Sequence, residues 1–318
     1  MSAGATKPLL YVVRALPGGD LDRLRALFEI RGNGARPPPR EELLREAREA
    51  VAVVVTYLDR VDQAFLAALP QLRHLASYGV GVNHLDLEAC RARGVLVTNT
   101  PGVVTAATAD LAMALLLAAA RRVAEGDRVV RAGGWTELDP GWLLGTEVTG
   151  KTLGLVGFGR IAQAVARRAA GFELRLLYTS PRPVKFPGAE RVPLDELLAR
   201  SDFVSLHVPL TPATARLLDG PRLRSMKRGA VLVNTARGEV VDDEALAAAL
   251  RDGHLAAAGL DVFPHEPRVP AALLGLSNVV LTPHVGSGSR ETRAAMARMV
   301  LEDVERVGRG EEPRHRVV

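Results

Sequence analysis

Short apolar segments alternate with amphipathic ones along the whole chain. The apolar segments are rich in Val, Leu and Ala, as expected for strands that are buried on both faces. We predict a first series of strands over 9–13, 51–56, 72–77 and 95–98. We predict a second series over 152–156, 174–178, 203–207, 230–234, 257–262 and 279–282.

The amphipathic segments between these strands predict helices. They lie over 20–28, 61–69, 85–93, 161–170, 194–199, 244–251 and, at the end of the chain, 290–307. Repeated strand–helix units form parallel sheets that helices cover on both faces. The fold class is therefore α/β, with two doubly wound parallel-sheet domains.

Two further helices are predicted between the two series, over 105–122 and 123–132. They are apolar on more than one face, and a helix of this kind lies in a core or an interface. The longest apolar run, 111–120, is too short to span a bilayer. An irregular stretch follows, in which Trp142 stands in a Pro-Gly-Trp turn.

Composition narrows the class of protein. A chain of 318 residues suggests about two domains. Cys90 is the only cysteine, and no secretory signal precedes the first strand, so we expect a cytoplasmic protein without disulfides. The net charge of +5 arises from arginines scattered among acids, which indicates solvated helix faces rather than a nucleic-acid partner. No His, Cys or Asp cluster has metal-ligand spacing, so no metal is expected.

A glycine-rich turn opens the second series. Gly157-x-Gly159-x-x-Ala162 lies between a predicted strand and a predicted helix. The first glycine permits the turn, the second lets a pyrophosphate approach, and the small third residue allows the helix to pack on the strand. Arg160 and Ile161 start the helix, whose free N–H groups would bind the pyrophosphate of a dinucleotide.

An acidic residue is absent where an NAD site would have one. In such sites an Asp or Glu binds the adenine ribose about 20 residues after the turn. Here Thr179, Ser180 and Arg182 occupy this region, and no acid occurs from 174 to 189. Because an arginine pairs with phosphate, we predict NADP(H) as the preferred cofactor and NAD(H) as an alternative. The other interpretation is that Arg182 and Lys185 belong to a solvated loop.

Three charged residues follow strands late in the second series. They are Arg237, Glu266 and His284. Ligands bind at the carboxyl ends of strands in open parallel sheets, so these side chains are candidates for one catalytic site.

The ordered motifs of the chain resemble those of the D-isomer-specific 2-hydroxyacid dehydrogenases, in particular the glyoxylate/hydroxypyruvate reductase branch. The motifs are Gly79-Val80-Gly81, His84-Leu85-Asp86, Asn99-Thr100-Pro101-Gly102, the glycine-rich turn, Pro209-Leu210-Thr211-Pro212, the Arg237 segment, Asp261-Val262-Phe263 and Pro283-His284. Glu266 argues against the formate-oxidising branch, which lacks this residue.

The resemblance implies a role for each candidate residue. His284 would be the general acid, Glu266 would favour its imidazolium form, and Arg237 would bind the substrate carboxylate. The backbone N–H groups of Val80 and Gly81 would hold the same carboxylate. The implied cofactor-binding residues, beside those named above, are Thr105, His207, Pro209, Thr235, Asp261 and Gly286.

The resemblance also implies a domain organisation. Residues 1–101 and 287–318 would form a flavodoxin-like substrate domain. Residues 102–286 would form a Rossmann cofactor domain, and the active site would be the cleft between the two, closed by a hinge. A dimerisation arm over about 105–145 would build a homodimer. Trp142 either reaches the partner's active site or packs in its own subunit.

The function that follows is NADPH-dependent reduction of a small 2-oxo acid, glyoxylate or hydroxypyruvate, to the 2-hydroxy acid. The same chemistry on 2-ketogluconate or an aryl pyruvate is an alternative. A nucleotide-sensing regulatory protein, like the C-terminal-binding corepressors, is a second, because a fold does not define an activity. DNA binding has no recognition motif in support.

Overall fold

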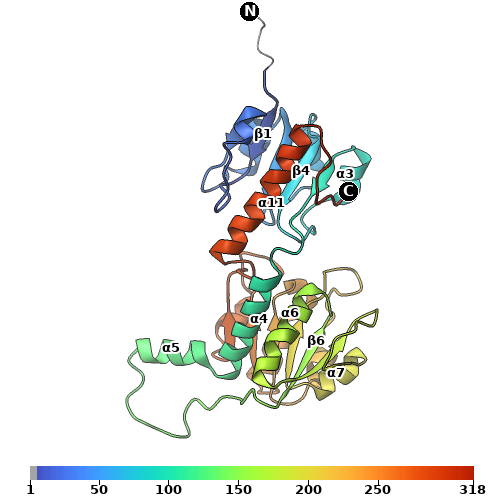
Figure 1. Ribbon diagram of the computed structural model, residues 1–318. Helices are drawn as coiled ribbons and strands as arrows, with labels where there is room; N and C mark the ends of the chain where they lie inside the picture. Colours follow the sequence, from blue (N-terminus) through green and yellow to red (C-terminus); the bar gives the residue numbers. More distant parts are fainter. Residues whose placement is uncertain (1–5) are drawn as a thin grey trace, which may run out of the picture. The chain divides into compact units, whose positions relative to one another are not determined.

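The computed structural model describes residues 6–318, and the chain divides into two compact units (Figure 1). Unit 1 comprises the residues up to Val104 together with Ser287–Val318, and unit 2 is Thr105–Gly286. Each unit contains one sheet in which all strands run parallel, with helices on both faces. The predicted α/β fold with two doubly wound parallel sheets is confirmed.

Unit 1 has the strand order β2-β1-β3-β4-β5, the flavodoxin-like order. Its strands are β1 (Leu9–Val12), β2 (Glu29–Gly32), β3 (Ala50–Thr56), β4 (His74–Tyr78) and β5 (Leu96–Thr98). Helices α1 (Arg40–Glu46), α2 (Gln63–Ala68) and α3 (Leu87–Ala92) cover one face, and the long helix α11 (Arg290–Gly308) covers the other. Burial of apolar side chains on both faces explains why the strands read as continuous apolar runs.

The helix predicted over 20–28 is wrong. Only one turn of 3-10 helix forms, η1 (Leu24–Ala26), and the chain then enters β2, which the pattern did not predict. Leu24 and Phe28 are buried, which gives the segment the apolar spacing of a helix. Strand β2 lies at the edge of the sheet and is mostly exposed, so it lacks the pattern of a buried strand.

Unit 2 has seven parallel strands in the order β12-β11-β10-β9-β6-β7-β8. They are β6 (Thr152–Val156), β7 (Arg175–Thr179), β8 (Ala189–Arg191), β9 (Phe203–Leu206), β10 (Ala230–Asn234), β11 (Leu255–Leu260) and β12 (Val279–Leu281). This is the Rossmann order with one strand added beyond β11. Strand β8, which is short and polar, was not predicted. The strand order reverses between β6 and β9, the place where doubly wound sheets bind dinucleotides.

Helices pack on both faces of the second sheet. Those on one face are α4 (Thr105–Ala120) and α6 (Arg160–Ala169). Those on the other are α7 (Leu194–Arg200), α8 (Gly220–Ser225), α9 (Asp243–Arg251) and α10 (Ala271–Leu274). Two 3-10 turns, η2 (Ala170–Phe172) and η3 (Gly238–Val240), complete the unit.

The two helices predicted between the series are confirmed as α4 and α5 (Val123–Arg131). Helix α4 packs on its own sheet, whereas α5 has no buried residue. In Figure 1, α5 and the loop after it extend away from the body of unit 2. Arg122 makes the turn between the two helices with a left-handed φ of 53°. Among residues 6–318, no helix is long and apolar enough to cross a membrane.

Candidate active site

Glu266 and His284 form a hydrogen-bonded pair in unit 2. Nδ1 of His284 lies 2.6 Å from Oε2 of Glu266, and the other carboxylate oxygen accepts a 2.9 Å bond from the Phe263 N–H. Glu266 follows β11 and His284 follows β12, neighbouring strands whose carboxyl ends lie at one edge of the sheet. Only about a quarter of the His284 side chain and a fifth of the Glu266 side chain are exposed, so the pair is partly shielded from water.

Asp261 fixes the backbone that carries His284. One of its carboxylate oxygens accepts bonds from the Thr282 hydroxyl at 2.6 Å and the Val285 N–H at 2.8 Å, and the other accepts from the Gly286 N–H at 2.8 Å. The His284 N–H donates to the Asp261 carbonyl. These bonds hold His284 at a φ of 52°, a left-handed conformation that costs energy for a residue with a Cβ.

Arg237 lies in a turn that Asn234 and Gly238 build. After β10, the amide of Asn234 donates to the Arg237 carbonyl and its oxygen accepts from the Ala236 N–H, both at 2.9 Å. A Cβ on Gly238 would stand 2.1 Å from the carbonyl carbon of Phe263. Only glycine therefore lets the Arg237 turn lie directly against the segment that leads to Glu266.

The electrostatics of the three residues are coupled. Burial alone would raise the pKa of Glu266, but the bonds from His284 and Phe263 and the charges of His284 and Arg237 outweigh it and lower that pKa. Burial lowers the pKa of Arg237, although a guanidinium stays protonated at neutral pH. Burial also raises the pKa of Asp261 above its ordinary value. At neutral pH the site thus combines a fixed carboxylate, an imidazole and a cation.

The glycine-rich turn fits the phosphates of a dinucleotide. Gly157 has a φ of 85°, and a Cβ there would stand 2.6 Å from the His207 carbonyl oxygen. Gly159 caps α6 without a side-chain bond, and a Cβ added to it meets open space. The N–H groups in the first turn of α6, from Arg160 and Ile161 onward, therefore have no cap and face room for an anion.

Other candidates for cofactor binding lie around the carboxyl ends of the same sheet. The buried Thr235 hydroxyl has no hydrogen-bond partner in the described part of the chain, as expected for a group that awaits a ligand. Burial lowers the pKa of His207 to about 4, so its ring, bonded to Ser205, is neutral at pH 7. Pro209 is exposed after β9, and Thr105 begins α4.

Val80 and Gly81 belong to unit 1, in the turn after β4. The amide of Asn99 donates to the Val80 carbonyl at 2.8 Å and so orients this turn. Within residues 6–318, neither the Val80 nor the Gly81 N–H has a backbone partner. Both groups are thus available to an oxyanion.

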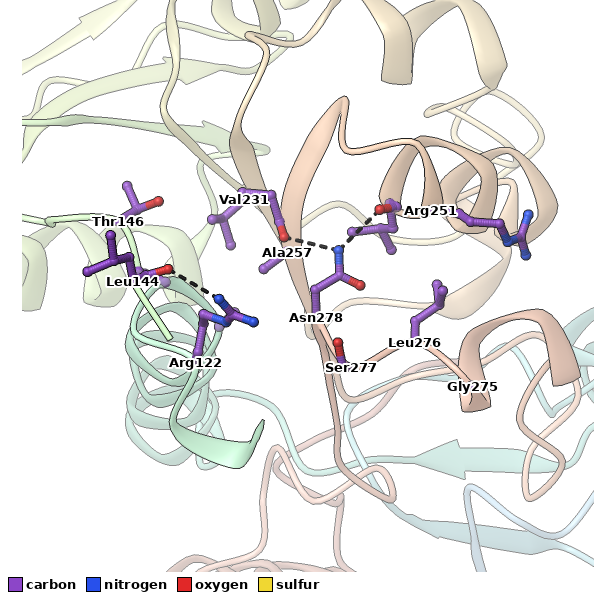
Figure 2. A pocket seen from close by; sticks show the side chains of 15 residues that line it. Arg122, Leu144, Thr146, Val231, Arg251, Ala257, Gly275, Leu276, Ser277 and Asn278 are labelled. Atoms are coloured by element: carbon purple, nitrogen blue, oxygen red, sulfur yellow. Dashed lines mark hydrogen bonds between the residues drawn. The ribbon is translucent and has the colours of Figure 1, made fainter. Parts of the chain in front are cut away.

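The amino ends of β10, β11 and β12 line a separate hollow of about 480 Å³. Figure 2 shows Asn278 in its wall, where the amide donates to the carbonyls of Leu250 and Ala256, and Arg122 beside Leu144. The catalytic candidates lie at the opposite ends of these strands. The hollow is therefore not part of the site, and Trp142, 40% exposed on the arm, does not line it.

No group of three or more His, Cys, Asp or Glu residues within 6–318 could hold a metal ion. The side chains gathered at the candidate site offer proton transfer and charge stabilisation beside a bound dinucleotide.

Comparison with known proteins defines the class. The family model of the D-isomer specific 2-hydroxyacid dehydrogenase NAD binding domain matches residues 113–286. A glyoxylate reductase of Pyrococcus furiosus is 48% identical over 316 residues, covering 96% of this chain and 94% of that protein. The chain belongs to the D-isomer specific 2-hydroxyacid dehydrogenase family. It is accordingly an NAD(P)-dependent oxidoreductase.

Solved structures agree over nearly the whole chain. The TT0316 protein of Thermus thermophilus superposes with a TM-score of 0.93 at 50% identity, covering 98% of this chain and all of that one. An NADPH-dependent glyoxylate/hydroxypyruvate reductase of Sinorhizobium meliloti, in complex with NADP and malonate, has a TM-score of 0.85 at 32% identity, covering 98% and 97%.

Proposed function

We propose that this protein reduces small 2-oxo acids, glyoxylate and hydroxypyruvate, to 2-hydroxy acids, with NADPH as the preferred reductant. The observation that carries the proposal is the 2.6 Å Glu266–His284 pair, set beside the buried Arg237 turn at the carboxyl ends of neighbouring strands. The names of the similar proteins, glyoxylate reductases and an NADPH-dependent glyoxylate/hydroxypyruvate reductase, support it.

The geometry of the Glu266–His284 pair indicates which nitrogen of His284 donates the proton. When bound, a reduced nicotinamide supplies a hydride to C2 of the substrate. Because Glu266 holds Nδ1 of His284, the other nitrogen, Nε2, is the one that donates a proton to the carbonyl oxygen as the C=O π bond breaks. The negative charge of Glu266 stabilises the imidazolium before transfer, and the neutral ring then regains a proton from water.

Arg237 and unit 1 bind the substrate in this proposal. The guanidinium pairs with the carboxylate and polarises the neighbouring carbonyl, where negative charge develops. The N–H groups of Val80 and Gly81 bind the same carboxylate. Residues 1–101 with 287–318 thus act as the substrate domain, and residues 102–286 as the cofactor domain.

The cofactor in this proposal lies along the carboxyl ends of β6, β7, β9, β10 and β11. Its pyrophosphate takes the first turn of α6, and its nicotinamide lies near Thr235 and Asp261. The remaining contacts are assigned to Thr105, Gly157, Gly159, Arg160, Ile161, Thr179, Ser180, Arg182, His207, Pro209 and Gly286. Among residues 6–318, Arg182 has no ion-pair partner and is exposed, so its charge is available to the 2′-phosphate of NADPH.

Steady-state kinetics test the proposal directly. Glyoxylate and hydroxypyruvate are each reduced with NADPH and with NADH, and 2-ketogluconate and phenylpyruvate serve as larger substrates. We expect the highest kcat/KM for a small substrate with NADPH. If only the larger acids are reduced efficiently, the proposed small substrates are wrong and a larger 2-oxo acid takes their place. Tight NADPH binding without turnover of any of them would favour a nucleotide sensor.

The arm supports a homodimer. Five of its large apolar side chains are more than half exposed: Val123, Val130, Trp135, Leu138 and Leu144. A surface of this kind fits a second copy of the chain better than water. We further propose that Trp142 limits substrate size in the partner's site. Sedimentation gives the oligomeric state, and unchanged selectivity between glyoxylate and phenylpyruvate in Trp142→Ala would remove the second proposal.

A further inference from the structure

The loop after β7 contains no acid, yet it is tightly held. The Tyr178 hydroxyl donates to the Val184 carbonyl at 2.9 Å and accepts from the Val184 N–H at 3.1 Å, which closes residues 178–184 into a compact loop. The Ser180 hydroxyl donates to the Arg182 carbonyl at 2.5 Å. Although Pro181, Arg182 and Lys185 are exposed, these bonds restrain the backbone of the loop.

Aromatic contacts join this loop to the glycine-rich turn. The ring of Phe158, between the two glycines of the turn, stacks on Tyr178 with 4.0 Å between centroids. The Phe186 ring packs edge-on against the Phe158 ring, with 5.4 Å between centroids. In addition, the Gly157 N–H donates to the Thr179 carbonyl. The segment that would bind the pyrophosphate and the segment that would bind the ribose are therefore fixed relative to each other.

Arg191, on the neighbouring strand β8, completes the loop. Its Nε and Nη2 donate to the Ser180 carbonyl at 3.2 and 2.9 Å, and Nη2 also reaches the Pro181 carbonyl at 3.3 Å. The guanidinium thus binds two consecutive carbonyls immediately before Arg182. Because a cation engages these two carbonyl oxygens, their partial negative charge is offset and repels a nearby phosphate less.

We propose that Arg191 is a positioning residue for the 2′-phosphate of NADPH: it holds the Ser180–Pro181 backbone so that Arg182 is presented to the phosphate. The inference rests on the proposed preference for NADPH and extends it. Because these bonds join protein groups only, they restrict the loop without help from a nucleotide and reduce the ordering entropy that binding would cost.

Direct binding of two fragments tests this without turnover. Titration calorimetry measures the Kd of adenosine 2′,5′-bisphosphate and of AMP, which differ by the 2′-phosphate. Arg191→Lys keeps the charge but cannot reach both carbonyls in the same way. We expect it to weaken bisphosphate binding roughly tenfold, the effect of one lost charged hydrogen bond, and to change AMP binding less than about twofold. Arg175→Lys is the matched control, since Arg175 is exposed at the amino end of β7.

The outcomes separate the two proposals. If wild-type protein binds the bisphosphate no more tightly than AMP, the proposed NADPH preference is wrong. If the wild type prefers the bisphosphate but Arg182→Ala keeps the same preference, Arg182 does not bind the 2′-phosphate, and the positioning role of Arg191 is overturned while the NADPH preference stands. If the preference exists and depends on Arg182 but Arg191→Lys binds like the wild type, only the positioning role is overturned. Equal weakening of both fragments in Arg191→Lys would also overturn it, because a merely structural role affects them alike. In steady-state kinetics, Arg191→Lys should have a higher KM for NADPH than the wild type and an unchanged KM for NADH.

Discussion

The two ends of β10, β11 and β12 differ in what their polar groups do. At the amino ends lies a hollow of about 480 Å³. Polar groups in its wall form hydrogen bonds with one another, as the Asn278 amide does with two carbonyls. At the carboxyl ends, Glu266 binds Nδ1 of His284, and the Arg237 turn is set against the same segment. The volume of a depression therefore does not locate the chemistry of this fold. Convergent charged side chains held by neighbouring backbone do.

The strongest test of the carboxyl end removes the proposed proton donor, His284. His284→Asn keeps a side chain that tolerates the left-handed backbone at this position, so the fold should persist. We expect kcat for 2-oxo acid reduction to fall by about 10²–10⁴, the usual contribution of a general acid. The KM for the nucleotide should change little. A kcat within about tenfold of the wild type would show that another group donates the proton.

Glu266→Gln removes the negative charge beside the proposed donor and leaves His284 in place. We expect kcat to fall roughly 10- to 100-fold, since the imidazole loses both the carboxylate that orients its ring and the counter-charge of its protonated form. The low pKa of Glu266 keeps the wild-type pair intact down to below the ordinary carboxylate range, where the stability contributed by the pair is lost as pH falls. A kcat equal to that of the wild type would contradict this role.

Gly238→Ala tests whether close packing at the carboxyl end matters. The new Cβ would meet the Phe263 backbone at 2.1 Å, so the Arg237 turn and the Glu266 segment must separate. We expect a loss of about 1–3 kcal/mol in the free energy of unfolding, as for overpacking, together with reduced kcat. Gly171→Ala is the control because its Cβ meets nothing within 4 Å. Denaturant unfolding that shows equal stability for both variants would refute the packing argument.

Asn278→Ala tests whether the hollow at the amino ends of the strands contributes to stability alone. Removing the amide takes one donor from the Leu250 carbonyl and one from the Ala256 carbonyl, and should lower the free energy of unfolding by about 1 kcal/mol. Because the hollow takes no part in the proposed chemistry, kcat and KM should remain at wild-type values. A specific fall in kcat, without loss of stability, would mean that the two ends are not as distinct as the structure indicates.

Much of this fold could be predicted from the sequence because buried strands and long helices carry strong periodic signals. Strands β2 and β8 were missed because they are short, polar edge strands whose pairing depends on neighbours distant in the chain. The helix over 20–28 was predicted wrongly because a buried 3-10 turn has a similar apolar spacing.

The candidate site was predicted from strand-end residues and ordered motifs, and the structure brings Glu266 and His284 together. Asn234, Gly238 and Arg191 were given no role of their own. Their importance arises from contacts between separate loops, such as the bonds of Arg191 to the Ser180 carbonyl, and no local pattern encodes those. An Asn at a strand end and a Gly after a candidate Arg were the available signals for two of them.

Acidic side chains gathered near the carboxyl ends of the strands repel one another and lower the stability of the fold. Asp243 is an example. Burial, together with the charges of Asp242, Glu244 and Glu239, raises the pKa of Asp243 to about 6. The folded state therefore binds a proton that the unfolded state has already lost, so the stability from this group is full below about pH 4 and disappears as pH rises through about 6.

Asp243→Asn removes the repulsion and should stabilise the protein by up to about 1 kcal/mol at about pH 7.5, after allowance for solvent screening. The gain should vanish below about pH 4. Urea unfolding at both pH values decides this: a variant less stable than the wild type at the higher pH would show that the carboxylate at the start of α9 stabilises the helix more than its neighbours repel it.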